Sequence, residues 1–197
     1  MKLERLLATL RDLQVRQYKH DQLAHQDIAL SLSVPARLAH FALHFAKYLG
    51  AMMRASREGR VDDRHRAIAD SFIIALAMAN TLNVDLQANI AASGRALPGG
   101  SVSGRTTQHE LMLYAEIVGD IAKACEATDH LEAFPSRKVL EESIVALVGS
   151  VVRLAMLDNL DLPALVETRW QRAEGKSFLF AGQAQSGPTL RSVARVA

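Results

Sequence analysis

The sequence RAIADSFIIALAMANTLNVDLQANI, residues 66–90, decides how this chain folds. Its long apolar run predicts a buried helix, Asn83 is typical of a left-handed helix stop, and Asp85 predicts the start of a second, short helix. The same order recurs in ESIVALVGSVVRLAMLDNLDLPALV, residues 142–166, where Asp161 follows Asp85 at an offset of 76 residues (161 − 85). The chain therefore carries the same pattern twice.

The offset also holds upstream of these two stretches. Residues 35–50 fall on residues 111–126 without a gap, and His40 thereby aligns with Glu116. A single ungapped register that joins two helices rarely arises by chance. It predicts a tandem duplication of a helical unit.

The other helices follow from apolar residues at three- and four-residue spacing and from their caps. Ser33 predicts an N-cap with Pro35 in the first turn, and Gly59 lies in the segment that ends the same helix. We expect helices over residues 3–19, 35–57, 62–82, 85–92, 108–127, 136–157 and 161–174.

These helices divide the chain into five segments. We expect an N-terminal helix and connector, a first repeat, a Gly- and Ser-rich linker, a second repeat and an irregular tail, at residues 1–34, 35–95, 96–107, 108–176 and 177–197. The long helix of each repeat is apolar almost all round, which is typical of burial on most sides. The expected fold class is all-α, a helical bundle of two tandem repeats with internal pseudo-two-fold symmetry.

The composition of the chain limits which classes of binding partner we expect. A net charge of +2 over 197 residues gives no strong nucleic-acid signal, and the single cysteine, Cys125, excludes a disulfide within the chain. The most apolar run, residues 71–79, is too short to span a bilayer, and the N-terminus has no apolar signal-peptide core. We expect a cytoplasmic protein with no membrane partner, either as a monomer or as a homo-oligomer built through the N-terminal helix.

Three features of the sequence resemble the MazG-like all-α nucleoside triphosphate pyrophosphohydrolases. They are an acidic helix, a helix that ends in Leu-Asn-Val-Asp-Leu, and a short closing helix. In that family the first helix carries EExxE and the second carries ExxD, and these carboxylates hold Mg²⁺. The resemblance implies metal-dependent hydrolysis of a nucleoside triphosphate to a monophosphate and pyrophosphate. Glutamates at three- and four-residue spacing share a helix face, and Mg²⁺ prefers carboxylate oxygens.

The second copy, AEIVGDIAKA, is similar to the acidic motif of the family. Glu116 matches its first glutamate, Ile117 replaces the second and Asp120 stands at the third. Glu142 lies one position from the place of the ExxD glutamate. The resemblance implies that Glu116, Asp120 and Glu142 are the catalytic and Mg²⁺-binding residues. It also implies a set of phosphate-binding cations: Lys123, Arg169, Arg172 and Lys176.

The first copy differs from the family motif in another way. His40 and His44 stand at acidic positions of the first helix, Asp70 matches the aspartate of ExxD, and Ala67 replaces its glutamate. Two imidazoles and one carboxylate suit Mn²⁺ or Zn²⁺ better than Mg²⁺. The alternative is that these polar residues fill a lost site and are satisfied by hydrogen bonds or water.

Three functions fit these observations. One is a hydrolase with a surviving site in the second copy, acting on a nucleoside triphosphate. Another is a catalytically inactive relative that binds a nucleotide or a protein, because neither copy has the full acidic set. A structural helical protein without a ligand is the third, since the acidic face of a helix is often only solvated and a fold does not settle a function.

Overall fold

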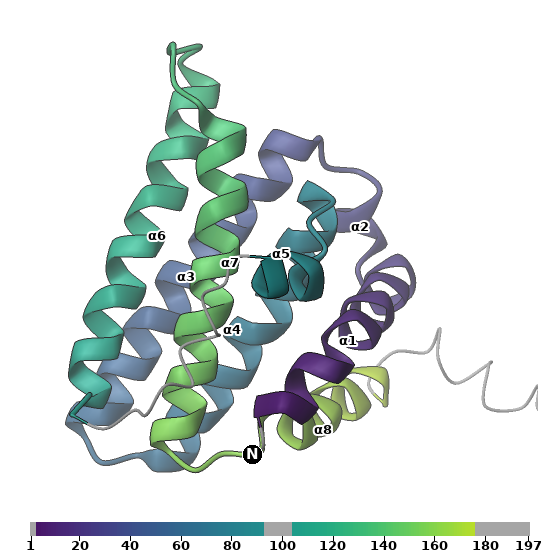
Figure 1. Cartoon of the computed structure of the whole chain (residues 1–197). Helices are drawn as coiled ribbons and strands as arrows, with labels where there is room; N and C mark the ends of the chain where they lie inside the picture. The colour runs from purple at the N-terminus through teal and green to yellow at the C-terminus, as the bar shows by residue number, and fades with distance from the viewer. Residues whose placement is uncertain (1–2, 93–103, 176–197) are drawn as a thin grey trace, which may run out of the picture.

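A computed structural model describes residues 3–92 and 104–175, and within these ranges all regular structure is helical, with no strand (Figure 1). This confirms the all-α prediction. The helices are α1 (Leu3–Ala24), α2 (Gln26–Ala29), α3 (Val34–Arg57), α4 (Val61–Leu82), α5 (Leu86–Ala92), α6 (Thr107–Asp129), α7 (Ser136–Leu157) and α8 (Leu162–Glu174).

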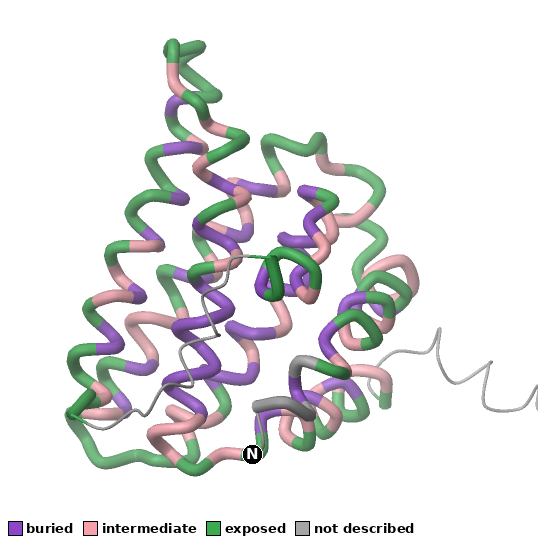
Figure 2. The backbone as a smooth tube through the Cα atoms, in the orientation of Figure 1, coloured by how far each residue is buried: buried purple, intermediate pink, exposed green. Residues whose placement is uncertain are grey.

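Four long helices form the bundle. The helical hairpin α3–α4 packs against the hairpin α6–α7, with α3 beside α6 and α4 beside α7 (Figure 1). Helices α4 and α7 together carry about half of the buried residues, as their apolar sequences predict (Figure 2). They are central because they have no wide polar face to turn toward water.

A second group of helices covers one side of the bundle. Helix α1 packs on α4, α5 and α8, and α2 follows it across a break at His25 (Figure 1). Helix α8 packs on α4, while α5 contacts α7. Each short helix therefore touches the long helix of the other hairpin.

The two predicted helix stops have the same backbone geometry. Asn83 has φ 58° and Asn159 has φ 52°, so both lie in the left-handed region. The N–H of Val84 donates to Ala79 at 2.9 Å, and the N–H of Leu160, 76 positions later, donates to Ala155 at 2.8 Å. Asparagine tolerates this conformation better than most residues, which explains why both helices end there.

The short helices also begin alike. The Asp85 carboxylate accepts a hydrogen bond from the N–H of Ala88 at 2.9 Å, and the Asp161 carboxylate accepts one from Ala164 at 3.3 Å. These are the N-caps that the sequence predicts. Ser33 likewise accepts from the N–H of Ala36, at 3.4 Å, at the start of α3.

The hairpin turns do not follow the 76-residue offset. The N–H of Arg60 donates to Ala55 after Gly59, whereas the N–H of Glu132 donates to Ala127 after Leu131, which is an offset of 72 residues (127 − 55). Helix α6 thus ends one turn earlier, and the connection to α7 is longer by about the same length. The ungapped alignment hides these two compensating changes.

Several helix ends differ from the predictions. Helix α1 reaches Ala24 because Gln17 and His20 are buried and the Gln17 amide donates to Asp21 at 2.7 Å. Helix α4 starts at Val61, with both aspartates expected to open it in its first turn. Residues 96–103 of the linker predicted at 96–107, and the tail predicted at 177–197, lie outside the described residues.

In the described ranges no single helix has the length and apolar character of a membrane span. Helices α4 and α5 reach that length and composition only when they are taken together, and the chain bends by 89° between them.

Candidate functional site

A cavity of about 280 Å³ lies where α1, α2, α3, α4 and α8 meet. Its apolar wall includes Phe41 from α3 and Ile74 from α4. Trp170, from α8, also lines it; this indole is buried and donates a hydrogen bond to Oε1 of Gln17 at 2.7 Å. A partly apolar enclosure of this size suits a small molecule with a flat ring.

The polar part of the lining includes Arg37, whose Nε–H is an unusual hydrogen-bond donor. One Nη of Arg37 donates to the carbonyl of Leu32 at 3.3 Å, whereas its buried Nε–H has no acceptor among the described residues. Buried donors of this kind are normally satisfied by water or a ligand. The other titratable side chains from α1, the α1–α2 junction and α3 are Tyr18, His20, Asp21, His25, His40, His44 and Tyr48.

A second, more open hollow of about 360 Å³ adjoins the cavity at the α3–α4 turn. Four arginines and two aspartates line it: Arg54, Arg60, Arg66, Arg169, Asp63 and Asp70. The excess of guanidinium groups favours an anion, and guanidinium forks match phosphate oxygens well. The side chain of Arg54 makes no hydrogen bond or ion pair with the rest of the described chain.

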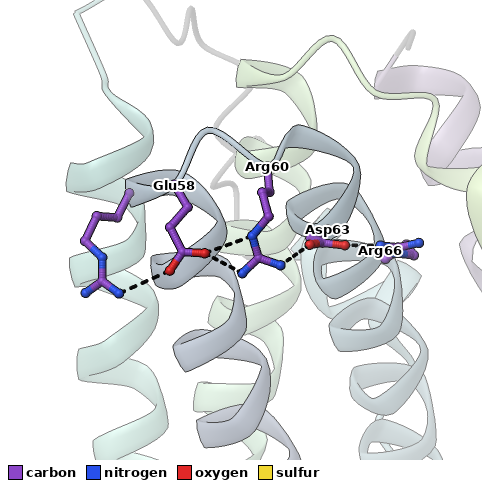
Figure 3. Close-up of polar contacts among 5 residues, drawn as sticks. Glu58, Arg60, Asp63 and Arg66 are labelled. Atoms are coloured by element: carbon purple, nitrogen blue, oxygen red, sulfur yellow. Dashed lines mark hydrogen bonds and ion pairs between the residues drawn. The ribbon is translucent and has the colours of Figure 1, made fainter.

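Exposed ion pairs hold two of these arginines along the turn (Figure 3). Arg60 contacts Glu58 at 2.7 Å and also pairs with Asp63, and Asp63 in turn pairs with Arg66. Hydrogen bonds from Arg60 and from Arg57 lower the pKa of Glu58. Exposed pairs of this kind contribute little stability, so an anion can exchange with them at small cost.

Three residues line both hollows and form the junction between them: Tyr48, Asp70 and Arg169. The Arg169 guanidinium donates two hydrogen bonds to the Asp70 carboxylate, at 2.6 and 2.9 Å, and the two side chains form a bidentate pair. Burial and the nearby Asp70 carboxylate raise the pKa of the Tyr48 hydroxyl to about 12. The junction is therefore a neutral phenol beside a paired carboxylate and guanidinium.

His20, Asp21 and His25 form a compact group at the α1–α2 junction. One ligand atom from each residue lies within 4.8 Å of the others, and in the described part of the chain no other three or more His, Cys, Asp or Glu residues meet this distance. Burial lowers the pKa of His20 to about 4 and raises the pKa of Asp21 to about 6. Both shifts favour the uncharged form of the side chain.

The first-copy residues predicted to bind a metal all line the cavity. The rings of His40 and His44 lie 4.6 Å apart, centre to centre, and burial lowers the pKa of His44 to about 4. Nδ1 of His44 lies 3.1 Å from the ammonium of Lys47. The ligand atoms of His40, His44 and Asp70 do not converge within 4.8 Å, and Asp70 is already paired with Arg169. Metal binding by these three stays a prediction.

The second-copy acidic residues lie outside both hollows. Glu116 and Asp120 are exposed on α6, and Glu142 is exposed on α7, 3.9 Å from Lys138. Together they form no group of ligand atoms within 4.8 Å in the described ranges. This arrangement does not fit a preformed Mg²⁺ site, and their catalytic role stays a prediction.

Of the predicted phosphate-binding residues that the structure describes, Arg169 alone lines the hollows. Lys123 is exposed and pairs with Glu126 at 3.0 Å and with Glu132 at 2.9 Å. Arg172 is exposed on α8, and Lys176 lies outside the described residues. Phosphate binding by Lys123 and Arg172 has no support from their placement, and phosphate binding by Lys176 stays a prediction.

The sequence contained signals for residues that the motif comparison missed. Arg54, Arg60 and Arg66 recur every six residues across the α3–α4 turn. The polar stretch of residues 19–26, at the end of α1, holds the three residues of the His20–Asp21–His25 group. Neither pattern belongs to the MazG-like motifs, which is why that resemblance did not point to them.

Comparison with protein-family models, with curated proteins and with solved structures found no match.

Proposed function

We propose that this chain is a tandem MazG-like protein that binds a nucleoside phosphate across the two adjoining hollows. The base and sugar occupy the cavity beside Phe41 and Trp170, and the phosphates occupy the arginine-lined hollow. The observation that carries this proposal is the shared junction, because the same three residues line both hollows and so place them side by side.

The tandem arrangement is supported by matched local geometry. The stops at Asn83 and Asn159 and the caps at Asp85 and Asp161 keep the 76-residue offset in their hydrogen bonds. The swapped packing of α5 on α7 and of α8 on α4 is what a pseudo-two-fold axis between two units would produce.

The chemistry of each hollow matches one part of a nucleotide. A flat, apolar base gains from burial against aromatic and aliphatic side chains, and the free Nε–H of Arg37 offers a donor to a base or sugar oxygen. Phosphate oxygens suit the guanidinium groups of Arg54, Arg60 and Arg66. Asp70 opposes this binding, because it neutralises Arg169.

We propose binding in preference to hydrolysis, because the acidic residues expected to hold Mg²⁺ are exposed and apart. The second candidate is the metal-dependent pyrophosphohydrolase that the family resemblance implies. One observation favours it: Asp70, the matched aspartate of ExxD, lies at the junction where the phosphates would begin. No catalytic step follows from the residues as they are placed.

Fluorescence of Trp170, the single tryptophan, provides the first test, because its ring lines the cavity. Titration with a nucleoside triphosphate, a monophosphate and a nucleoside, with chelator present, should give the tightest binding for the triphosphate. Arg54→Ala and Arg66→Ala should each weaken triphosphate binding about tenfold, because each removes a charge-assisted contact. Asp70→Asn should tighten it, because this change releases Arg169.

Arg172→Ala is the matched control, since Arg172 is an exposed arginine outside both hollows. It should bind like the unmodified chain. Equal binding of nucleoside and triphosphate, or equal losses in Arg54→Ala and Arg172→Ala, would remove the support for a phosphate subsite. Release of pyrophosphate from the triphosphate with Mg²⁺ or Mn²⁺, lost in Asp70→Asn, would instead select the hydrolase.

A further inference from the structure

We propose that His20, Asp21 and His25 bind one divalent transition-metal ion at the α1–α2 end of the cavity. This site is separate from the His40, His44 and Asp70 set. It does not rest on the proposed function, because the metal is measured without any nucleotide.

The ligand atoms are already close enough for one ion. Metal–ligand distances of about 2.0–2.2 Å require ligand atoms within roughly 4.4 Å of one another. The 4.8 Å limit that holds for these three residues leaves only a small side-chain adjustment. Two imidazole nitrogens and one carboxylate oxygen favour Zn²⁺ or Co²⁺ over Mg²⁺ or Ca²⁺.

Neighbouring residues hold the carboxylate in place. The buried amide of Gln17 donates from Nε2 to Oδ1 of Asp21 at 2.7 Å, and Oε1 of the same amide accepts from Trp170 at 2.7 Å. Hydrogen bonds of this kind orient metal ligands and increase metal affinity. They leave Oδ2 of Asp21 as the oxygen for the ion.

The backbone brings the third ligand to the other two. The N–H of His25 donates to the carbonyl of Asp21 at 3.1 Å, which closes the chain at the break between α1 and α2. His20 is buried, Asp21 is half-buried and His25 is exposed, so the ion can enter from solvent. All three line the cavity, so the remaining coordination positions lie on the side of the proposed base site.

Titration of chelator-treated, full-length protein with Co²⁺, followed by visible absorption and calorimetry, tests this site. We expect one Co²⁺ per chain, displaced by Zn²⁺, and a higher Tm with metal than without. Asp21→Asn and His25→Ala should each weaken Co²⁺ binding by at least about tenfold. Circular dichroism checks that both variants remain folded, and the exposure of His25 makes that variant the safer of the two.

His109→Ala is the matched control, because His109 is an exposed histidine on α6. It should keep the Co²⁺ affinity of the unmodified chain. Absence of Co²⁺ binding would overturn the proposal. So would binding that survives in folded Asp21→Asn and His25→Ala, or binding that only His40→Ala abolishes. Nucleotide binding in chelator tests the proposed function separately, so either can fail alone.

Discussion

Asp70 and Arg169 are the residues on which the candidate site depends most. Their bidentate pair joins α4 to α8 and is about three-quarters shielded from solvent, with side-chain exposures of 22% and 26%. A shielded bidentate pair is stronger than the exposed pairs at the α3–α4 turn. It therefore fixes the junction, while the arginines at the turn remain available to an anion.

At the residue scale, His44 predicts how stability depends on pH. Its pKa falls from 6.5 in the unfolded chain to about 4 in the folded protein, first through burial and then through Lys47 and His40. Between these two pH values the folded state therefore binds fewer protons than the unfolded chain. The contribution of His44 to the free energy of unfolding is highest above pH 6.5, where His44 is neutral in both states, and it falls as the pH drops toward 4. His44→Gln should reduce the pH dependence of urea unfolding in this window, and His20, whose pKa is also lowered to about 4, should account for part of what remains.

The matched control for this prediction is His109→Gln, which replaces an exposed histidine whose ring is solvated in the folded and unfolded chain alike. Its pH dependence should follow that of the unmodified protein. An unchanged slope in His44→Gln, measured with chelator present, would contradict the role of His44. Asp21 acts in the opposite sense, because its raised pKa of about 6 reduces stability as pH rises from 3.8.

At the scale of elements, α1 covers part of the bundle surface and so encloses one side of the cavity. Gln14 ties this helix to the α4–α5 turn: its Nε2 donates to the Val84 carbonyl at 2.9 Å, and its Oε1 accepts from the N–H of Leu86 at 2.9 Å. The Asn80 amide returns a hydrogen bond to the Gln14 carbonyl at 2.9 Å. The Gln14 side chain thus caps α5 and also fixes the position of α1.

Gln14→Ala should lower the free energy of unfolding by about 1–3 kcal/mol, because it leaves the buried N–H of Leu86 and the carbonyl of Val84 without this partner. Urea unfolding followed by circular dichroism measures the loss. Gln108→Ala, at an exposed position in the first turn of α6, is the control and should change stability by less than about 0.5 kcal/mol. Equal losses in the two variants would show that α1 is not held by this contact.

At the scale of the whole molecule, the two hairpins share one core. The buried hydroxyls of Ser71 in α4 and Tyr114 in α6 lie 2.6 Å apart, and the cluster of buried apolar side chains runs through both hairpins. In contrast, no described residue of α6 or α7 lines either hollow, and Glu116 and Asp120 of α6 face solvent. Helix α1 packs on α4 and α5 of the first copy and on α8 of the second.

A shared core predicts a single unfolding transition. Urea unfolding followed by circular dichroism, which reports all helices, and by Trp170 fluorescence, which reports α8, should give coincident curves. Tyr114→Phe should shift both curves together, by about 1–2 kcal/mol, because it leaves the Ser71 hydroxyl without this partner. Ala146→Ser, at a surface position of α7, should leave both curves unchanged. Separate transitions would mean that the hairpins fold independently.

The sequence by itself determined the helices and their ends. Apolar spacing, Asn83, Asp85 and their later counterparts act within a few residues of the chain, so local rules suffice to predict α7 at residues 136–157 and α3 to within one residue. Local rules place His40 and His44 on one helix face, whereas the prediction that Asp70 lies near them came from the family resemblance. Local rules failed at the end of α1, where burial of Gln17 and His20 extends a polar helix.

Only the tertiary structure decided which charged residues meet. Arg169 was predicted to serve the second copy, yet it pairs with Asp70 of the first, because α8 packs across α4. The His20–Asp21–His25 group and the arginine-lined hollow arise where α1 and the α3–α4 turn come to lie against the bundle. Helix packing between distant segments sets these contacts, and periodicity along one helix carries no information about which partner its face will meet.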